Sequence, residues 1–308
     1  MNKNASVTFV ICTYNRANYL DNALKSLLKH KPHDLSFQLL VVDNNSSDQT
    51  PEVVKKYQQS FNKEDKSLRY IKETQQGISY ARNCGIQETN TPYIVFLDDD
   101  IEASESLISA WIEFFSENPK ALAAGGKIHV RFDDPKPKWM SHFLLPLFGR
   151  HDLGKTFKKY PSKKFPFAGN MGVKKSIFEE IGYFNTKYGQ RGKKLYAKGE
   201  EKELSQRIRS ITKDIYYLPD AFVYHHVDES RLTTEYVKEH AMGMGRSQKI
   251  RIKNESFREG LSERITEIEK WLVSIPLALG YLISFQPAKA TMLIRFRWWI
   301  WKGYKDLK

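Results

Sequence analysis

The sequence predicts an α/β fold built on a mostly parallel central sheet with helices on both of its faces. Short apolar runs alternate along the first 120 residues with segments whose apolar residues recur at helical spacing. The apolar runs are almost continuous, which is typical of strands buried on both faces. The chain has 308 residues, of which 41% are hydrophobic, so it can bury a large core.

Four strand–helix units follow one another from residue 6 to residue 115. The expected strands are 6–12, 37–43, 68–73 and 93–97, and the expected helices are 18–30, 50–61, 77–89 and 104–115. Thr50 stands where a helix N-cap is expected, and Pro51 stands at the first helical position. In parallel sheets the carboxyl ends of the strands meet at one edge, and ligands bind there.

Polar side chains gather where these strands end. They are Thr13, Asn15 and Arg16 after the first strand, Asp43 and Asn44 after the second, and Asp98, Asp99 and Asp100 after the fourth. Turn preferences would explain one such cluster, but several at one edge indicate a binding site. Adjacent carboxylates repel one another and need a cation, a hydrogen-bond network or open solvent. Asp98 and Asp100 offer oxygen ligands to Mg²⁺ or Mn²⁺, which would neutralise a pyrophosphate.

The net charge favours an anionic partner, and the cysteine content argues against a disulfide-rich or zinc-binding protein. A formal net charge of +13 predicts attraction to a nucleotide, a phospholipid surface or nucleic acid. The two cysteines, Cys12 and Cys84, predict neither a disulfide framework nor a zinc site, so we expect a reducing cytoplasm. The first apolar run is too short for a signal peptide or a membrane span. The sequence has no Walker loop, and Gly243 to Gln248 does not match the dinucleotide fingerprint.

Several motifs together resemble the inverting glycosyltransferases of family 2, which have the GT-A fold. They are "VTFVICTYNR", "LLVVDNNSSDQT", "QQGISYARNCGI", "YIVFLDDD", "FPFAGNMGVKKSIFEEIGYFN", "GEEKEL", "YLPDAFVYHHV" and "RLTTEY". The resemblance runs from about Ser6 to Ser247, in order. The processive members carry a Gln-x-x-Arg-Trp motif and several membrane spans, and this sequence has neither, so the addition of a single sugar is expected.

The resemblance implies a set of site residues. The nucleotide would contact Thr13, Asn15, Arg16, Asp43, Asn44, Gln76, Gly77, Arg82, Asn83, Asp98 and Asp99. Asp98 and Asp100 would form the DXD motif that binds Mn²⁺ or Mg²⁺, with His225 completing the metal shell. Gly169, Asn170 and Met171 would approach the donor sugar or the acceptor, where a glycine lets the backbone come close to a ligand.

The resemblance also implies a catalytic base. The family usually has Gly-Glu-Asp at this position, whereas this sequence has Gly199, Glu200 and Glu201. Glu201 is therefore the expected base and Glu200 the alternative. The additional methylene of a glutamate moves its carboxylate by roughly 1.5 Å. Without the resemblance, this acidic run would be explained as the start of a solvated helix.

The boundaries expected from the resemblance place a glycosyltransferase domain at 1–247. Its nucleotide-sugar half is about 1–125 and its acceptor half about 126–247. A basic stretch with apolar residues, Arg131 to Lys164, suits a lipid-pyrophosphate acceptor, or it is a solvated insert with a small core. A helical extension follows at 248–308. Its segment from Lys289 onward mixes basic residues with tryptophan, which favours an anionic lipid surface, or else the helices pack on the catalytic domain or a second subunit.

We therefore expect a metal-dependent, inverting transfer of one sugar from a nucleotide-sugar, UDP-linked by family habit, to a hydroxyl. The acceptor would be a glycan or a lipid-linked oligosaccharide in bacterial-type surface polysaccharide synthesis. The protein would be cytoplasmic and peripheral at the inner face of the membrane, with no nucleic-acid partner. Two alternatives stay open, a sugar-phosphate nucleotidyltransferase and a non-enzymatic basic protein that binds membrane or nucleic acid. The first normally has a glycine-rich phosphate loop where this chain has "CTYNRANYL".

Overall fold

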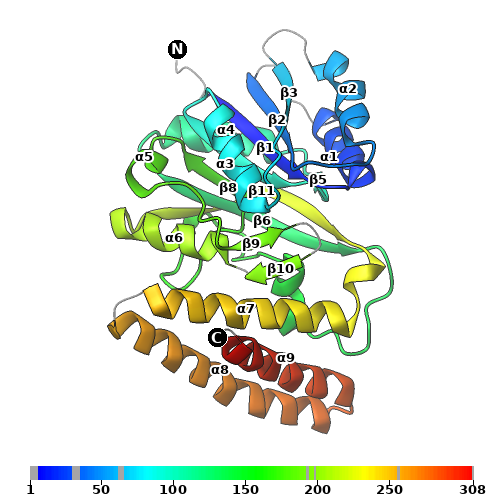
Figure 1. The fold of residues 1–308 in the computed structure, drawn as a ribbon, viewed down its shortest axis with the longest axis vertical. Coiled ribbons are helices and arrows are strands. Elements are labelled where there is room, and N and C mark those ends of the chain that lie inside the picture. Colours follow the sequence, from blue (N-terminus) through cyan, green and yellow to red (C-terminus); the bar gives the residue numbers. More distant parts are fainter. Residues whose placement is uncertain are drawn as a thin grey trace. The chain divides into compact units, whose positions relative to one another are not determined.

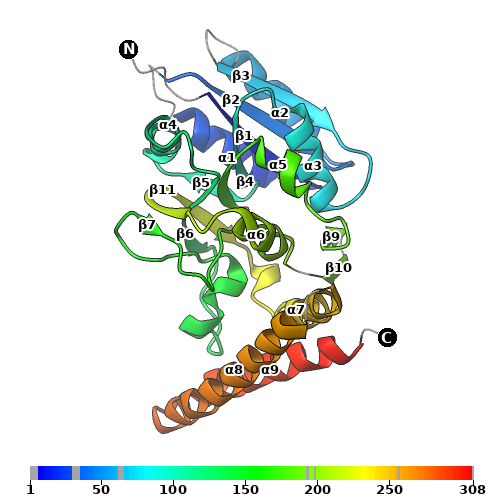
Figure 2. The same cartoon turned by 90° about the vertical axis from the view of Figure 1, so that its left-hand side faces the viewer.

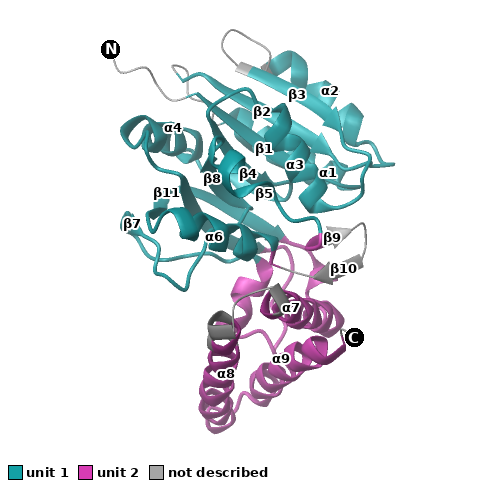
Figure 3. Cartoon of the chain, turned by 60° about the vertical axis from the view of Figure 1, so that its left-hand side comes forward, with its two compact units in different colours: residues 1–131, 149–186, 200–226 teal, residues 132–148, 187–199, 227–308 magenta. Residues whose placement is uncertain are grey.

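Two compact units make up the chain in the computed structural model (Figure 3). Unit 1 comprises Met1–Arg131, Gly149–Thr186 and Glu200–His226, and unit 2 comprises Phe132–Phe148, Lys187–Gly199 and Val227–Lys308. The structure describes residues 6–29, 35–61, 66–191, 194–197, 199–254 and 257–306.

A parallel group of four strands forms one half of the unit 1 sheet (Figure 1). In spatial order they are β3 (Lys66–Lys72), β2 (Phe37–Asp43), β1 (Val7–Thr13) and β4 (Tyr93–Asp98). The register sets Thr13 opposite Asp43, and Cys12 opposite Asp98. The polar residues at the ends of β1, β2 and β4 therefore lie along one edge, as the sequence predicts.

The other half of the sheet continues from β4 in the order β8 (Asn170–Lys174), β6 (Ala123–Phe132), β11 (Ile215–Val227) and β5 (Ile101–Ala103), and β7 (Lys158–Lys159) pairs with β11. In this half β8 is antiparallel to both β4 and β6, and β11 is antiparallel to both β5 and β7. The sheet is therefore mixed, and the parallel arrangement that the sequence predicts holds for its amino-terminal half.

Helices cover both faces of the sheet, which confirms the predicted architecture (Figure 2). Residues of α1 (Ala17–Lys29), α2 (Thr50–Phe61) and α4 (Leu107–Glu117) share one apolar cluster with the strands. Residues of α3 (Ile78–Glu88), α5 (Ile177–Ile181) and α6 (Glu200–Ile211) share the cluster on the other face. The starts of α1, α3 and α6 place side chains around the carboxyl ends of β1, β2 and β4.

The start of α2 differs in detail from the prediction. The Thr50 hydroxyl donates to a carboxylate oxygen of Asp48 at 2.6 Å, and the Thr50 backbone N–H donates to the same oxygen at 3.2 Å. The other Asp48 oxygen accepts from the backbone N–H of Ala17 at 2.9 Å. Asp48, and not Thr50, therefore accepts from the backbone N–H of the first residue of each helix, Ala17 in α1 and Thr50 in α2. It links the starts of the two helices.

Unit 2 contains three long helices, α7 (Thr234–Asn254), α8 (Phe257–Ile283) and α9 (Pro287–Asp306). It also holds the hairpin of β9 (Gly189–Arg191) and β10 (Lys194–Ala197), and the 3-10 turns η1 (His142–Phe148) and η2 (Glu229–Arg231). The α7 helix runs through residue 247, so the structure has no break where the sequence predicts that the extension begins. Among the described residues, no helix is long and apolar enough to cross a membrane.

Two glycines allow α7 and α9 to approach closely. A Cβ on Gly245 would lie 2.0 Å from the Ile300 carbonyl oxygen, and a Cβ on Gly303 would lie 2.1 Å from the Met242 carbonyl oxygen. No side chain fits in either place.

The basic middle segment that the sequence indicates, Arg131 to Lys164, is divided between the units. Residues 132–148 belong to unit 2, where the ring of Phe148 stacks on the ring of Tyr236 at 5.7 Å between ring centres.

Candidate active site

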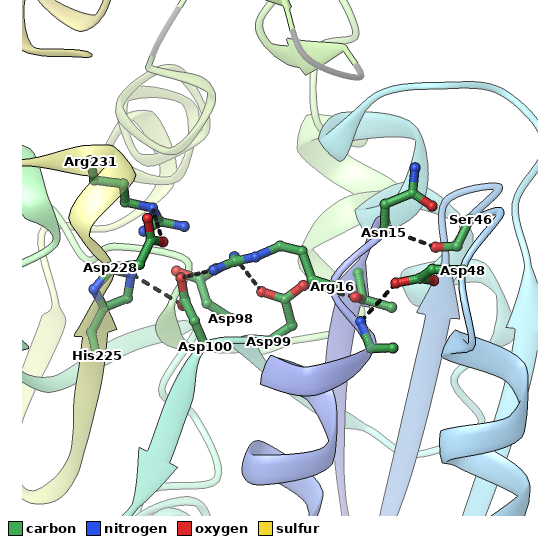
Figure 4. A network of polar contacts seen from close by, with 12 residues as sticks. Asn15, Arg16, Ser46, Asp48, Asp98, Asp99, Asp100, His225, Asp228 and Arg231 are labelled. Atoms are coloured by element: carbon green, nitrogen blue, oxygen red, sulfur yellow. Dashed lines mark hydrogen bonds and ion pairs between the residues drawn. The ribbon is translucent and has the colours of Figure 1, made fainter. Parts of the chain in front are cut away.

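A cluster of two aspartates and a histidine lies where β4 ends. After Asp98 the chain turns through Asp99 and Asp100 into β5, and β5 pairs with β11 so that Ile101 lies opposite His225. One ligand atom each of Asp98, Asp100 and His225 lies within 4.8 Å of the others (Figure 4). The His225 Nε2 atom is 3.1 Å from Asp100 Oδ1. The structure thus brings together the three residues expected to hold a metal.

Arg16 spans two carboxylates of this turn (Figure 4). Its guanidinium donates to Asp99 Oδ1 at 2.6 Å and to Asp100 Oδ2 at 2.9 Å, and the Thr13 hydroxyl donates to Asp99 Oδ2 at 2.7 Å. Burial alone would lower the pKa of Arg16, but the charges of Asp99 and Asp100 outweigh it and raise that pKa. Asp99 is therefore held by Arg16 and Thr13, while Asp98 and Asp100 face His225.

The carboxyl groups of Asp98 and Asp99 are buried, and burial raises the pKa of both. Burial raises the pKa of Asp98, the charge of Asp100 raises it further, and Arg82 lowers it only in part. Burial also raises the pKa of Asp99 to about 6, although Arg16 acts in the opposite direction. Two carboxylates and one imidazole suit a divalent cation of the Mn²⁺ or Mg²⁺ type, and the positive charge of such a cation would stabilise the ionised carboxylates. The residues present therefore fit the cofactor expected from the sequence.

Gly169 lies directly against Asp98. A Cβ at this position would come within 2.4 Å of Asp98 Oδ2. We therefore expect Gly169→Ala to displace the Asp98 carboxylate and to weaken Mn²⁺ affinity about 10-fold or more, since ligand geometry governs affinity. Titration calorimetry with Mn²⁺ measures this. Gly280→Ala is the control, because no heavy atom lies within 4 Å of the added Cβ. Equal Mn²⁺ affinity in wild type and Gly169→Ala would contradict the expectation.

The residues after β1 and β2 hold each other's loops. Asn15 has a φ of 52°, its backbone N–H donates to the Ser46 hydroxyl at 2.9 Å, and its side-chain oxygen accepts from the Ser47 N–H at 2.7 Å. Asp43 is fully buried and accepts from the Ser46 N–H at 2.8 Å and from the Tyr70 hydroxyl at 2.6 Å. No pattern in the sequence indicates Ser46 or Tyr70 as site residues.

The loop before α3 is attached to the end of β2 through Asn44. The Asn44 side-chain oxygen accepts from the Gly77 N–H at 2.6 Å, and its side-chain nitrogen donates to the Gln75 carbonyl at 2.7 Å. Gln76 donates to the Asn44 carbonyl at 3.0 Å. Gly77 has a φ of 145°, a backbone conformation that favours glycine. Asn44, Gln76 and Gly77 therefore lie together, as expected for residues of one site.

Arg82 lies between Asp98, one of the three expected metal ligands, and the acidic start of α6. Its guanidinium is 3.0 Å from Glu200 Oε1, 3.7 Å from Glu201 Oε1 and 3.9 Å from Asp98 Oδ1. Burial alone would lower the pKa of Arg82, but Glu201 and Glu200 raise it. The side chain of Glu200 is 10% exposed and that of Glu201 is 23% exposed. The two glutamates therefore differ: Glu200 is the closer partner of Arg82, and Glu201 is the more accessible.

Three predicted side chains are not brought to this edge of the sheet. Both polar atoms of the Asn83 side chain pair with the backbone of Phe184 at 2.9 Å. Asn170 is fully buried, accepts from the Trp111 indole N–H at 3.0 Å and donates to the carbonyl of Ala221 at 2.8 Å. Met171 is also fully buried, in the apolar cluster beneath α3, α5 and α6. In this structure the side chains of these three residues support the sheet and the helices around it, while Gly169 lies against Asp98.

A comparison with known families agrees with this geometry. The sequence model described as "Glycosyl transferase family 2" matches residues 8–182, more than half of the chain. The chain belongs to this family. It is therefore an enzyme of the transferase type, and the non-enzymatic alternative no longer applies. The matched segment contains the ends of β1, β2 and β4, Arg82 and Gly169.

Two relatives of the chain are named as different enzymes. A glucosyl-dolichyl phosphate glucuronosyltransferase of Haloferax volcanii is 25% identical over 248 residues, which cover 79% of this chain and 76% of the relative. A teichoic acid poly(glycerol phosphate) polymerase of Staphylococcus epidermidis is 30% identical over 124 residues, 40% of this chain and only 16% of that protein. The activities in these names are those of the relatives.

Solved structures show the same fold. The mannosyltransferase PcManGT from Pyrobaculum calidifontis, in complex with GDP-Man and Mn²⁺, matches with a TM-score of 0.66 at 16% identity, over 98% of this chain and 88% of that one. S. aureus TarS 1-349 in complex with UDP-GlcNAc matches with a TM-score of 0.57 at 16% identity, over 98% and 92%. The fold is therefore GT-A, as the resemblance of the sequence implies.

Proposed function

We propose that the protein transfers a single sugar from a nucleotide-sugar to an acceptor hydroxyl, with inversion at the anomeric carbon and with a divalent cation as cofactor. The observation that carries this proposal is the convergence of Asp98, Asp100 and His225 within 4.8 Å, next to the acidic start of α6. Asp98 and Asp100 with His225 would hold Mn²⁺ or Mg²⁺. When bound, the cation would neutralise charge on the leaving diphosphate.

The chain's own residues support the rest of the reaction. Hydrogen bonds among Thr13, Arg16 and Asp99 hold the turn that carries the proposed metal ligands Asp98 and Asp100. The loops after β1, β2 and β3 line the same edge of the sheet and would bind the nucleotide. The residues that hold these loops are Asn15, Asp43, Asn44, Gln76 and Gly77. The nucleotide complexes of the structural neighbours, with UDP-GlcNAc or GDP-Man, support a nucleotide-sugar donor, and we propose UDP as the donor nucleotide.

Glu201 is the proposed base. It would accept the proton of the acceptor hydroxyl while the hydroxyl oxygen attacks the anomeric carbon from the side opposite the diphosphate, so that the configuration inverts. Its position in the first turn of α6 and its partial exposure support this role, whereas Glu200 is engaged at 3.0 Å by the buried Arg82. Arg82 would orient both carboxylates.

Thermal stability in the presence of nucleotides tests the donor and the metal together. We expect UDP with Mn²⁺ to raise the melting temperature, because a ligand that binds only the native state stabilises it by mass action. GDP, dTDP and CMP with Mn²⁺ should raise it less, and UDP with EDTA should have little effect. A larger shift with another nucleotide would show that the donor carries that nucleotide and not UDP. A shift with UDP that persists in EDTA would contradict the proposed need for a metal ion. Transfer to a defined acceptor, with the anomer determined by NMR, tests the inversion.

We further propose a glycan or lipid-linked acceptor at an anionic membrane surface, which the protein contacts through α9. That helix carries five basic residues and one acidic residue. The exposed rings of Trp298 and Trp301 lie under the ammonium groups of Lys302 at 5.5 Å and Lys305 at 4.1 Å. Tryptophan beside lysine is typical of helices at lipid interfaces. The name of the Haloferax relative, which includes a dolichyl phosphate, supports a lipid-linked acceptor.

Vesicle sedimentation tests the membrane contact. We expect binding to vesicles that contain about 30% anionic lipid, and the double substitution Lys302→Glu with Lys305→Glu should reduce the bound fraction several-fold, since each basic residue near such a surface contributes about 1 kcal/mol. The matched control is Lys25→Glu with Lys29→Glu, two exposed lysines on α1. Equal losses in both double variants would show that only the net charge matters and would contradict a role for α9.

A further inference from the structure

The outer side of α8 carries a continuous line of exposed apolar residues. From Leu261 to Leu282 they recur at alternating spacings of four and three residues, as Leu261, Ile265, Ile268, Leu272, Ile275, Leu279 and Leu282, and each is between 46% and 65% exposed. We call these seven residues the α8 seam. A 3.5-residue repeat of this kind is the pattern by which one helix packs along another.

The rest of unit 2 uses a different side of α8. Ala278 packs in a cluster with Ala290 and Leu293 of α9, and the buried Ser274 accepts from the Arg297 side chain at 3.1 Å. Figure 2 shows α8 and α9 as a pair of long neighbouring helices joined by a short connection. The α8 seam is therefore additional to the surface that holds α8 in its own unit, and an exposed apolar line of this length marks an interaction surface.

The charge of α8 favours a protein partner over a lipid one. Phe257–Ile283 contains four acidic and three basic residues, whereas the basic excess of this unit lies on α9. An anionic lipid surface would attract α9 and would be repelled by the acidic residues of α8. The helix that carries the apolar line is thus not the helix that carries the positive charge.

The residues that flank the α8 seam indicate a specific partner. In the heptad that the seam defines, Arg264 occupies a g position and Glu269 the following e position, and both side chains are exposed. In two parallel helices in register, a g residue faces the e residue five positions later on the partner helix, where opposite charges attract. Two copies of the same α8 would therefore form Arg264–Glu269 pairs on both sides of the seam.

We propose that the protein self-associates through the α8 seam, with the α8 helices of two or more copies parallel and in register. The apolar residues would lie between the helices, and Arg264 of one copy would face Glu269 of another. Sedimentation equilibrium of the full chain, without detergent, measures the mass and gives the number of copies. A mass of two or more chains supports the proposal, and a chain that stays monomeric at about 100 µM overturns it.

Matched substitutions test whether the α8 seam is the contact. Leu272→Gln should raise the dissociation constant roughly 100-fold, because two or more buried leucines are lost per assembly. Val273→Gln is the control, because Val273 is the next residue on the same helix, is 58% exposed, and lies outside the seam. If both substitutions weaken association equally, the seam is not the contact. If the wild type is monomeric and only Leu272→Gln abolishes vesicle binding, lipid covers the seam and the proposal fails.

Charge reversal tests the parallel register. Arg264→Glu alone and Glu269→Arg alone should each weaken association about 10-fold, because like charges then face each other. If sedimentation gives two chains, a one-to-one mixture of the two variants should associate as the wild type does, because each side chain at position 264 would face a side chain of opposite charge at position 269 of the other variant. A mixture as weak as the separate variants would overturn the parallel arrangement.

Discussion

Asp100→Asn should lower kcat/KM for sugar transfer by about 1,000-fold, or about 4 kcal/mol of transition-state stabilisation. The substitution keeps the size of the side chain but removes one of the two carboxylates that lie within 4.8 Å of His225. An amide oxygen is a weaker ligand for a hard divalent cation, and the negative charge that attracts the cation is lost. Arg16 also loses one of its two anionic partners.

Two measurements separate a loss of metal from a loss of fold. Asp100→Asn should keep its circular dichroism spectrum and should no longer be stabilised by Mn²⁺ with UDP. The control is Asp220→Asn, because Asp220 is an exposed aspartate on β11, the strand that also carries His225. Turnover by Asp100→Asn within 10-fold of the wild type would remove Asp100 from the metal site and leave Asp98 with His225.

The amino-terminal half of unit 1 could be predicted from the sequence because each of its strands is a short apolar run followed by an amphipathic helix. In such a unit the position of the carboxyl edge follows from general rules of parallel sheets. Thr13, Asp43 and Asp98 therefore come together as predicted. Local pattern sufficed because the residues that contribute to the edge directly follow their strands.

The position of His225 next to Asp100 could not be derived from local pattern. It depends on the antiparallel pairing of β5 with β11, and β5 has only three residues, too few for any periodicity. The two residues are 125 positions apart in the chain. Only the resemblance to a family indicated His225, and the distance of 3.1 Å between His225 Nε2 and Asp100 Oδ1 is what the pairing produces.

The "GNM" run shows a different case, in which the structure places neighbouring residues of one motif in different surroundings. Gly169 precedes β8 and lies against Asp98, while Asn170 and Met171 are within the strand. Neighbouring residues of a strand point to opposite faces of a sheet, and here helices cover both faces. Asn170 therefore meets Trp111, and Met171 enters the other apolar cluster. The sequence predicts helices on both faces of the sheet, but no local pattern in the "GNM" run indicates which of its side chains these helices cover.

Glu201→Gln should lower kcat by about 100- to 10,000-fold, the range over which a positioned base typically contributes, with a smaller effect on the affinity for the donor. The amide cannot accept the proton of the acceptor hydroxyl, although it keeps the place of a carboxylate that lies 3.7 Å from Arg82. Glu201→Asp should retain more activity than Glu201→Gln, since it keeps a carboxylate and shortens its reach by roughly 1.5 Å.

Glu200→Gln supplies the contrast that assigns the base. Glu200 is the 3.0 Å partner of the buried Arg82, so its neutralisation should destabilise the fold by about 3 kcal/mol and leave more turnover than Glu201→Gln leaves. Denaturant unfolding and steady-state kinetics on both variants measure the two effects. If Glu200→Gln proved inactive but stable, and Glu201→Gln active, the roles would be exchanged, and the more buried of the two carboxylates would be the base.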